Sequence, residues 1–407
     1  MKKTFFKKLF TASIAAITAL SVFRGVPTFA DENADATATA SGENSVQVAI
    51  NKTLHIAEGI TTPTATFTFT FTEKDGTSSN GAPYQRGVTI PSRSVQYSKT
   101  DIPTADKIVK PTENIFDGVI YEHAGEYVYE VKETKSGWNP IKKDGVDIDA
   151  MKYDDRSYEM HVLVKNKSNG GTYISSVYFK QIGISNAPKK EPSDKVGSFK
   201  YDLFDNTYTK DGGKIDPKDP DPSNPTQVNP LTQSLKILKK VDGNYGDKSK
   251  DFNFRFTVKL PSTNATSAKP VTKITVNISG TQEELTVGDD NTTFSKEFSL
   301  KHGQDFTISN IPAGSRYTIT EVGTKGYTAS ANYKENGDDK TKADGIQATD
   351  FTMSNILIGE KTNDNTITNK FQDVTPTGLL IDNLPFILMI GLGLAGFVVL
   401  SKKRREA

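Results

Sequence analysis

The chain has no cysteine among its 407 residues, so disulfide bonds cannot stabilise it. Its formal net charge is +1, and the segment between its two ends has no block of basic residues to support nucleic-acid binding. The four histidines are scattered and form no group with carboxylates at metal-ligand spacing. The paired Asp154 and Asp155 come without a catalytic motif and are interpreted as turn residues. We therefore expect no metal, no cofactor and no enzyme that turns over a substrate.

Long apolar runs are confined to the two ends of the chain. Lysines precede an apolar run over residues 9–22, and Thr28-Phe29-Ala30 offers small residues at the cleavage positions. This order predicts a signal peptide over residues 1–30. Residues 31–44 are small and polar, which favours disorder. The mature chain should therefore begin near Asp31, outside the cell.

The C-terminus carries a pentapeptide, an apolar run and a basic tail in that order. The pentapeptide is Val374, Thr375, Pro376, Thr377 and Gly378. The apolar run over 384–400 is just long enough to cross a bilayer as a helix, and the cations at 402–405 would hold its end in the cytoplasm. The pentapeptide resembles the LPxTG-type signals that sortases cut between Thr and Gly, with Val-Thr in place of Leu-Pro. We expect residues 379–407 to be removed on sorting; the alternative is an ordinary membrane anchor.

Between these ends the chain is a succession of strand-like segments. Residues 66–72 alternate threonine with phenylalanine, and residues 252–258 show the same period of two. No long stretch has helical periodicity. Four prolines within residues 216–225 interrupt the pattern and predict an extended, semi-rigid linker. We expect an all-β protein of two β-sandwich domains, 45–210 and 231–372, joined by a linker over 211–230.

The two halves repeat one arrangement of charged residues. Lys52 and Lys239 each lie among apolar residues on one face of the first strand of their half. Glu133 and Glu321 each end a later alternating strand on its inward face, 81 and 82 residues after the lysine. A lysine is almost never buried without a partner. The simpler alternative is that each lysine reaches a sheet edge and each glutamate is solvated. The matched spacing in both halves favours buried pairs.

An asparagine is the third member expected in each half. Asn369 faces inward in the last strand before the C-terminal signal, and Asn206 occupies the last strand before the linker. Asn186 is an alternative to Asn206, with a spacing from Glu133 closer to that of the second half. Choosing it would make residues 173–186 one strand without a turn, so Asn206 is preferred.

Lysine, glutamate and asparagine gathered in an apolar core can react with one another. Desolvation lowers the pKa of the amine and raises that of the acid, so a neutral amine beside a protonated acid becomes accessible. The amine can then attack the asparagine carbonyl while the acid shuttles protons and ammonia leaves. The sequence predicts one self-generated Lys–Asn isopeptide bond per half, Lys52 to Asn206 and Lys239 to Asn369, with Glu133 and Glu321 as the proton shuttles.

The strand motifs resemble a known family of surface proteins. Tyr127-x-Tyr129-x-Val131-x-Glu133, Tyr317-Thr-Ile319-Thr-Glu321 and Thr366-Ile-Thr-Asn369 are similar to segments of Gram-positive backbone pilins, above all the streptococcal T-antigen type. The resemblance implies immunoglobulin-like (Cna-B-type) domains, an internal isopeptide bond in each, and polymerisation by a sortase into a cell-wall-anchored pilus.

The same resemblance implies a set of partners and one further lysine. The partners are identical subunits, the sortase and peptidoglycan, with minor pilins and host surface molecules as additional ones. An exposed lysine near the start of the last strand of the first domain should accept Thr377 of the next subunit, and Lys195 and Lys200 both qualify. The alternative function is a wall-anchored adhesin in which the two domains form only a stalk.

Overall fold

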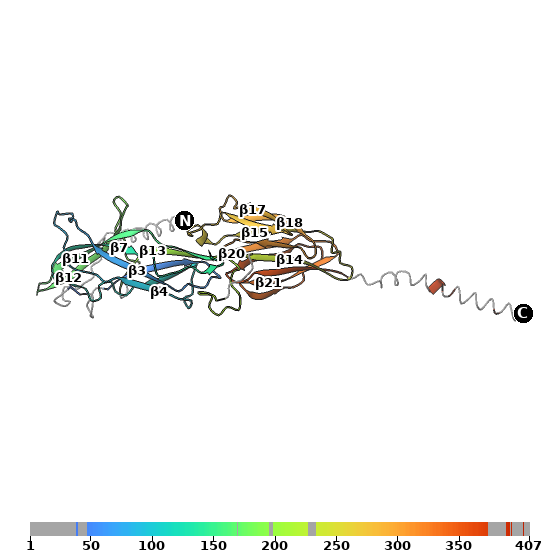
Figure 1. The fold of residues 1–407 in the computed structure, drawn as a ribbon, viewed down its shortest axis with the longest axis horizontal. Coiled ribbons are helices and arrows are strands. Elements are labelled where there is room, and N and C mark those ends of the chain that lie inside the picture. Colours follow the sequence, from blue (N-terminus) through green and yellow to red (C-terminus); the bar gives the residue numbers. More distant parts are fainter. Residues whose placement is uncertain are drawn as a thin grey trace, which may run out of the picture.

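The computed structural model describes residues 38–39, 47–168, 170–194, 198–226, 233–372, 388–390, 392 and 402. The predicted signal peptide, the pentapeptide 374–378 and Lys195 lie outside these residues. Within the described part of the chain, no helix is both long enough and apolar enough to span a bilayer. The described fold is nearly all β, as the alternating segments predict, and its two sandwiches lie end to end (Figure 1).

The first domain contains two facing sheets. In the described residues they have the strand orders β10-β13-β2-β5 and β12-β11-β7-β3-β4, with two short pairs, β1-β6 and β8-β9, beside them. The strands are β1 (Ala38–Thr39), β2 (Val48–Ile56), β3 (Ala65–Glu73), β4 (Arg93–Tyr97), β5 (Lys107–Pro111), β6 (Ile120–Tyr121), β7 (Gly125–Glu133), β8 (Lys142–Lys143), β9 (Val146–Asp147), β10 (Asp149–Lys152), β11 (Ser157–Asn166), β12 (Thr172–Gln181) and β13 (Phe199–Lys210).

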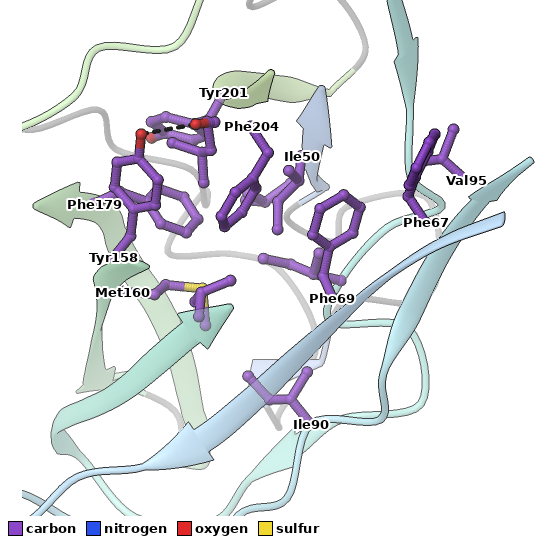
Figure 2. Close-up of a cluster of buried hydrophobic side chains, with 14 of the residues drawn as sticks. Ile50, Phe67, Phe69, Ile90, Val95, Tyr158, Met160, Phe179, Tyr201 and Phe204 are labelled. Atoms are coloured by element: carbon purple, nitrogen blue, oxygen red, sulfur yellow. Dashed lines mark hydrogen bonds between the residues drawn. The ribbon is translucent and has the colours of Figure 1, made fainter. Parts of the chain in front are cut away.

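The core of the first domain is aromatic. The alternation in β3 buries Phe67 and Phe69 completely, with the intervening threonines on the outer face. Phe69 stacks on Phe204 of the facing sheet with ring centroids 5.1 Å apart, and Tyr158 meets Phe204 edge-on at 5.3 Å (Figure 2). The Tyr158 hydroxyl donates to the Leu203 carbonyl at 2.7 Å. This packing anchors β13 against the facing sheet.

The second domain repeats this plan. Its described sheets have the orders β17-β16-β19-β14-β24-β21-β22 and β18-β15-β20-β23. Its elements are β14 (Leu235–Asp242), β15 (Phe252–Lys259), the 3-10 turn η1 (Ser262–Asn264), β16 (Lys273–Ile278), β17 (Thr281–Thr286), β18 (Thr293–Leu300), β19 (Asp305–Ile308), β20 (Ser315–Glu321), β21 (Tyr327–Glu335), β22 (Asp338–Lys342), β23 (Phe351–Ile358) and β24 (Asp364–Phe371).

In each domain the first and last long strands are parallel neighbours. Strand β2 pairs with β13, and Lys52 lies opposite Phe204 across a register shift between Asp202 and Phe204. Strand β14 pairs with β24, and Lys239 lies opposite Ile367. Asn206 comes two residues after Phe204, and Asn369 comes two residues after Ile367. Because side chains alternate along a strand, that offset puts lysine and asparagine on the same inward face.

A buried ion pair joins the two domains. Lys210, the last residue of β13, places its Nζ 2.8 Å from Glu360 Oε2, and the two side chains are 0% and 1% exposed. Lys210 also donates to the Pro222 carbonyl at 2.6 Å, and the Thr61 hydroxyl donates to Glu360 Oε1 at 2.5 Å. Removing one partner of such a pair is costly because the other charge stays buried. The two domains therefore meet through specific contacts.

The segment expected to be an extended linker packs against this junction. Ile215 is fully buried, its N–H donates to the Glu360 carbonyl at 2.9 Å, and it bridges to Lys361. Gly314 of the second domain has φ +91°, and a Cβ there would fall 2.4 Å from Ala57 Cβ of the first domain. Close approach of the backbones requires glycine at this position.

Candidate functional sites in the two cores

In the first domain Lys52, Glu133 and Asn206 meet between the sheets. Lys52 Nζ donates to Glu133 Oε2 at 2.7 Å, and Asn206 Nδ2 donates to Glu133 Oε1 at 2.6 Å. Lys52 and Asn206 are 0% exposed, and Glu133 is 8% exposed. The glutamate therefore bridges the amine and the carboxamide that the sequence analysis pairs.

The three residues come together because two sheets face each other. Lys52 and Asn206 project from the adjacent strands β2 and β13, whereas Glu133 ends β7 in the opposite sheet, where it pairs with Phe69 of β3. The Lys52 amine also lies 5.1 Å from the centre of the Phe67 ring. The Phe67 ring thus covers the amine, and the side chains of Lys52 and Glu133 are fully buried from solvent.

Burial moves the pKa values of both ionisable groups toward the neutral forms. Desolvation lowers the pKa of Lys52, opposed by the charge of Glu133 and their hydrogen bond. Desolvation likewise raises the pKa of Glu133, opposed by Lys52 and by the hydrogen bonds from Lys52 and Asn206. Proton transfer from the ammonium to the carboxylate therefore costs much less here than in water.

The second domain holds the same three residue types. Asn369 Nδ2 donates to Glu321 Oε1, and Lys239 Nζ donates to Asn369 Oδ1. Lys239 Nζ also lies 3.3 Å from Glu321 Oε2. All three side chains are at most 2% exposed, and the amine lies 4.4 Å from the centre of the Phe252 ring. The amine thus lies against the carbonyl group that it would attack.

The pKa shifts in the second domain run in the same directions. Burial lowers the pKa of Lys239 to about 8, against the opposing charge of Glu321. Burial also raises the pKa of Glu321, opposed first by the charge of Lys239 and then by the hydrogen bond from Asn369. Both sites therefore combine a weakened base with a weakened acid, as condensation of an amine with an amide requires.

The alternative asparagine and the candidate acceptor lysines lie elsewhere. Strand β12 ends at Gln181, and Asn186 is exposed in the turn that follows, with φ 54°. Lys200 lies in β13, and its side chain is 29% exposed and pairs with Asp194 at 2.8 Å. Lys195 lies outside the described residues. Asn206, and not Asn186, therefore occupies the cluster with Glu133.

Sequence reasoning missed one participant at the first site. Asp154, interpreted as a turn residue, donates its backbone N–H to Asn206 Oδ1 at 2.8 Å. Its carboxylate accepts from the N–H of Asp205 at 2.7 Å and from Arg156. The only signal in the sequence was an acidic residue two positions before an arginine, which is common in turns.

Two family models match the chain. Residues 48–209 match the family described as the Spy0128-like isopeptide containing domain. Residues 233–356 match a family described as a domain of unknown function (DUF7601). The first match spans the first sandwich, the second covers the second sandwich up to residue 356, and together they include both lysine–glutamate pairs. The second ends before Asn369.

Relatives of known kind extend the comparison over most of the chain. A pilin of Streptococcus pyogenes serotype M1 is 25% identical over 343 residues, which is 82% of this chain and 83% of that pilin. The pilus tip adhesin Cpa of Streptococcus pyogenes is 39% identical over 115 residues, 28% of this chain and 15% of the adhesin. The structure of the T3.2 major pilin of Streptococcus pyogenes has 20% identity and a TM-score of 0.33, covering 83% of this chain and all of that one.

Proposed function

We propose that this chain, which is similar to a streptococcal pilin, is the shaft subunit of a covalently polymerised surface pilus, a structural protein stabilised by an internal Lys–Asn isopeptide bond in each domain. The presence of the same Lys–Glu–Asn cluster in both cores is the observation that carries this proposal. The similarity to a pilin over 82% of the chain supports the same function.

The bond forms once in each domain, without an external enzyme. In the first domain Lys52 passes a proton to Glu133, and its neutral amine attacks Cγ of Asn206. The carbonyl π electrons move to Oδ1 as the new N–C bond forms. The intermediate then collapses: the Oδ1 electrons re-form the carbonyl, the Cγ–Nδ2 bond breaks as Nδ2 takes the proton from Glu133, and ammonia leaves. The Glu133 carboxylate then takes the extra proton from the new amide nitrogen. Glu133 acts in turn as base, acid and base, for which its raised pKa suits it. Lys239, Glu321 and Asn369 perform the same steps in the second domain.

Mass spectrometry tests these bonds directly. Each bond releases one ammonia, so mature chains of residues 31–377 should be about 34 Da lighter than their sequence requires. Glu133→Ala and Glu321→Ala should each restore about 17 Da. An undiminished mass in the unmodified chain would refute the internal bonds. Tandem spectra of tryptic peptides would identify the linked pairs.

Polymerisation would join Thr377 of one subunit to a lysine of the next, with a sortase as the transpeptidase and peptidoglycan as the final anchor. Lys200 is on the described surface of the first domain, and Asp194 holds its amine near the entrance of β13. Lys195 is the other candidate. Replacing each with arginine and examining the high-molecular-weight ladder on cells would identify the acceptor. A ladder that survives both single changes and the double change would exclude both lysines.

The alternative function, an adhesin with a stalk of isopeptide domains, has one supporting observation. The tip adhesin Cpa is 39% identical over 28% of this chain. Both matched sandwiches are accounted for as shaft domains, however, which favours the shaft. Immunogold labelling distinguishes the two functions, because a shaft subunit is labelled along the entire fibre and a tip adhesin only at its end.

A further inference from the structure

The two clusters differ in what holds the carbonyl oxygen of the asparagine. In the first domain Asn206 Oδ1 accepts the backbone N–H of Asp154 at 2.8 Å. In the second domain the donor to Asn369 Oδ1 is the attacking amine of Lys239 itself. Among the described residues, no backbone N–H donates to Asn369 Oδ1.

We propose that the backbone N–H of Asp154 is an oxyanion donor for isopeptide formation in the first domain, and that the side chains of Asp154 and Arg156 position it. This inference rests on the proposed function and adds a participant to it. When the amine attacks Cγ of Asn206, negative charge develops on Oδ1. A fixed N–H at 2.8 Å stabilises that charge in a site from which water is excluded.

The turn that presents this N–H is fastened to the strand carrying the reacting asparagine. Strand β10 ends where Lys152 pairs with Thr207 of β13, and Asp154 follows two residues later. The Asp154 carboxylate, 5% exposed, accepts the N–H of Asp205 at 2.7 Å and the N–H of Arg156 at 2.9 Å. The Arg156 guanidinium in turn reaches Asp205 Oδ2 at 2.8 Å.

This network fixes the donor with respect to Asn206, because Asp205 precedes it directly. Burial raises the pKa of Asp154, but the hydrogen bonds from Arg156 and Asp205 outweigh it and hold the pKa below its usual value. The carboxylate therefore remains ionised and keeps both contacts. Its charge also raises the pKa of Glu133, after the larger effect of burial, and so favours the acid form that protonates the leaving ammonia.

Replacing one atom tests the donor. The full chain is made with the α-hydroxy analogue of aspartate at position 154, so that an ester oxygen replaces the N–H. It is isolated in denaturant before it has folded and is then folded by dilution. The Lys52–Asn206 and Lys239–Asn369 peptides are quantified over time. We expect the first bond to form about 100 to 1,000 times more slowly, in line with the loss of one oxyanion donor, and the second at its normal rate.

Side-chain variants test the positioning role. Asp154→Ala should slow only the bond of the first domain, and Asp154→Asn, which keeps an oxygen for the N–H of Asp205, should restore much of the rate. Asp155→Ala is the matched control, because that neighbouring carboxylate is 75% exposed and pairs with Lys135. Each substitution is also made in a Glu133→Ala background, in which no bond forms. The melting temperature of that double variant reports the effect of the substitution on folding alone.

The outcomes separate this inference from the function on which it rests. If the chain with the ester forms the Lys52–Asn206 bond no more than about threefold more slowly than the unmodified chain, the oxyanion role is refuted and the isopeptide proposal stands. The expected slowing is at least about 100-fold, so the two results are easily distinguished. If the unmodified chain never yields the Lys52–Asn206 peptide, the isopeptide proposal fails and this inference fails with it.

Discussion

Replacing Asn206 with alanine would remove the bond of the first domain while leaving the Lys52–Glu133 pair in place. A link between Lys52 and Asn206 would close a loop of about 150 residues, which by the entropy relation for disulfides stabilises a domain by about 5 kcal/mol. The lost hydrogen bond from Asn206 to Glu133 adds about 1 kcal/mol. For a domain of this size the melting temperature should fall by roughly 10 to 20 °C.

The control is a buried asparagine that makes no such link. Asn51 precedes Lys52 in β2, is 8% exposed, and donates to Asp202 at 2.7 Å and to Ser193 at 3.3 Å. Asn51→Ala loses hydrogen bonds of the same kind, so it should cost about 1 to 2 kcal/mol and leave both links intact.

Calorimetry of the two variants tests this prediction, and the intact mass of the same samples shows which bonds have formed. Asn206→Ala should retain a deficit of only about 17 Da and show a much lower transition for the first domain. The reasoning is refuted if the mass of Asn206→Ala shows that one bond is lost but the melting temperature of its first domain falls no further than that of Asn51→Ala.

Two further predictions concern pH and the junction. In the reactive form, Lys239 and Glu321 share one proton. Bond formation in the second domain should therefore slow above pH about 8, where Lys239 loses that proton. It should also slow at low pH, where both groups are protonated. The profile is measured by folding never-folded chains at each pH, and a rate that keeps rising well above pH 8 would contradict it. At the junction, Lys210→Ala leaves Glu360 buried without its cation and should cost about 3 to 5 kcal/mol, whereas Lys210→Met with Glu360→Gln should cost much less. Chemical denaturation of both variants tests this, and equal losses would argue against a buried charge as the cause.

The strand pattern predicts the parts of the fold that follow from local periodicity. An inward lysine in a run of alternating apolar residues has to lie between sheets, and Lys52 and Lys239 do so. The matched spacing to Glu133 and Glu321 predicts that both halves share one topology, which the parallel pairing of first and last strands reproduces. These inferences need only the period of two and the assumption that a buried charge finds a partner.

Local sequence patterns could not predict contacts between loops that lie far apart in the chain. Asp154 approaches Asn206 only because β10 pairs with β13, and nothing local distinguishes it from any turn carboxylate. Lys210 and Glu360, 150 residues apart, each look like solvated surface residues in the sequence. Ile215 is a single apolar residue in a stretch rich in aspartate and proline, so its burial depends on the surface presented by the second domain.

The parallel arrangement of β14 and β24 has a mechanical consequence. A pull along the fibre enters the second domain at Leu235 and leaves it after Phe371, at opposite ends of two adjacent strands. If the proposed bond joins Lys239 to Asn369, tension would cross from one strand to the other within a few residues of each. The 129 residues between those two would then carry no part of the pull, because the covalent route bypasses them. Such a subunit would stretch very little before a chemical bond breaks.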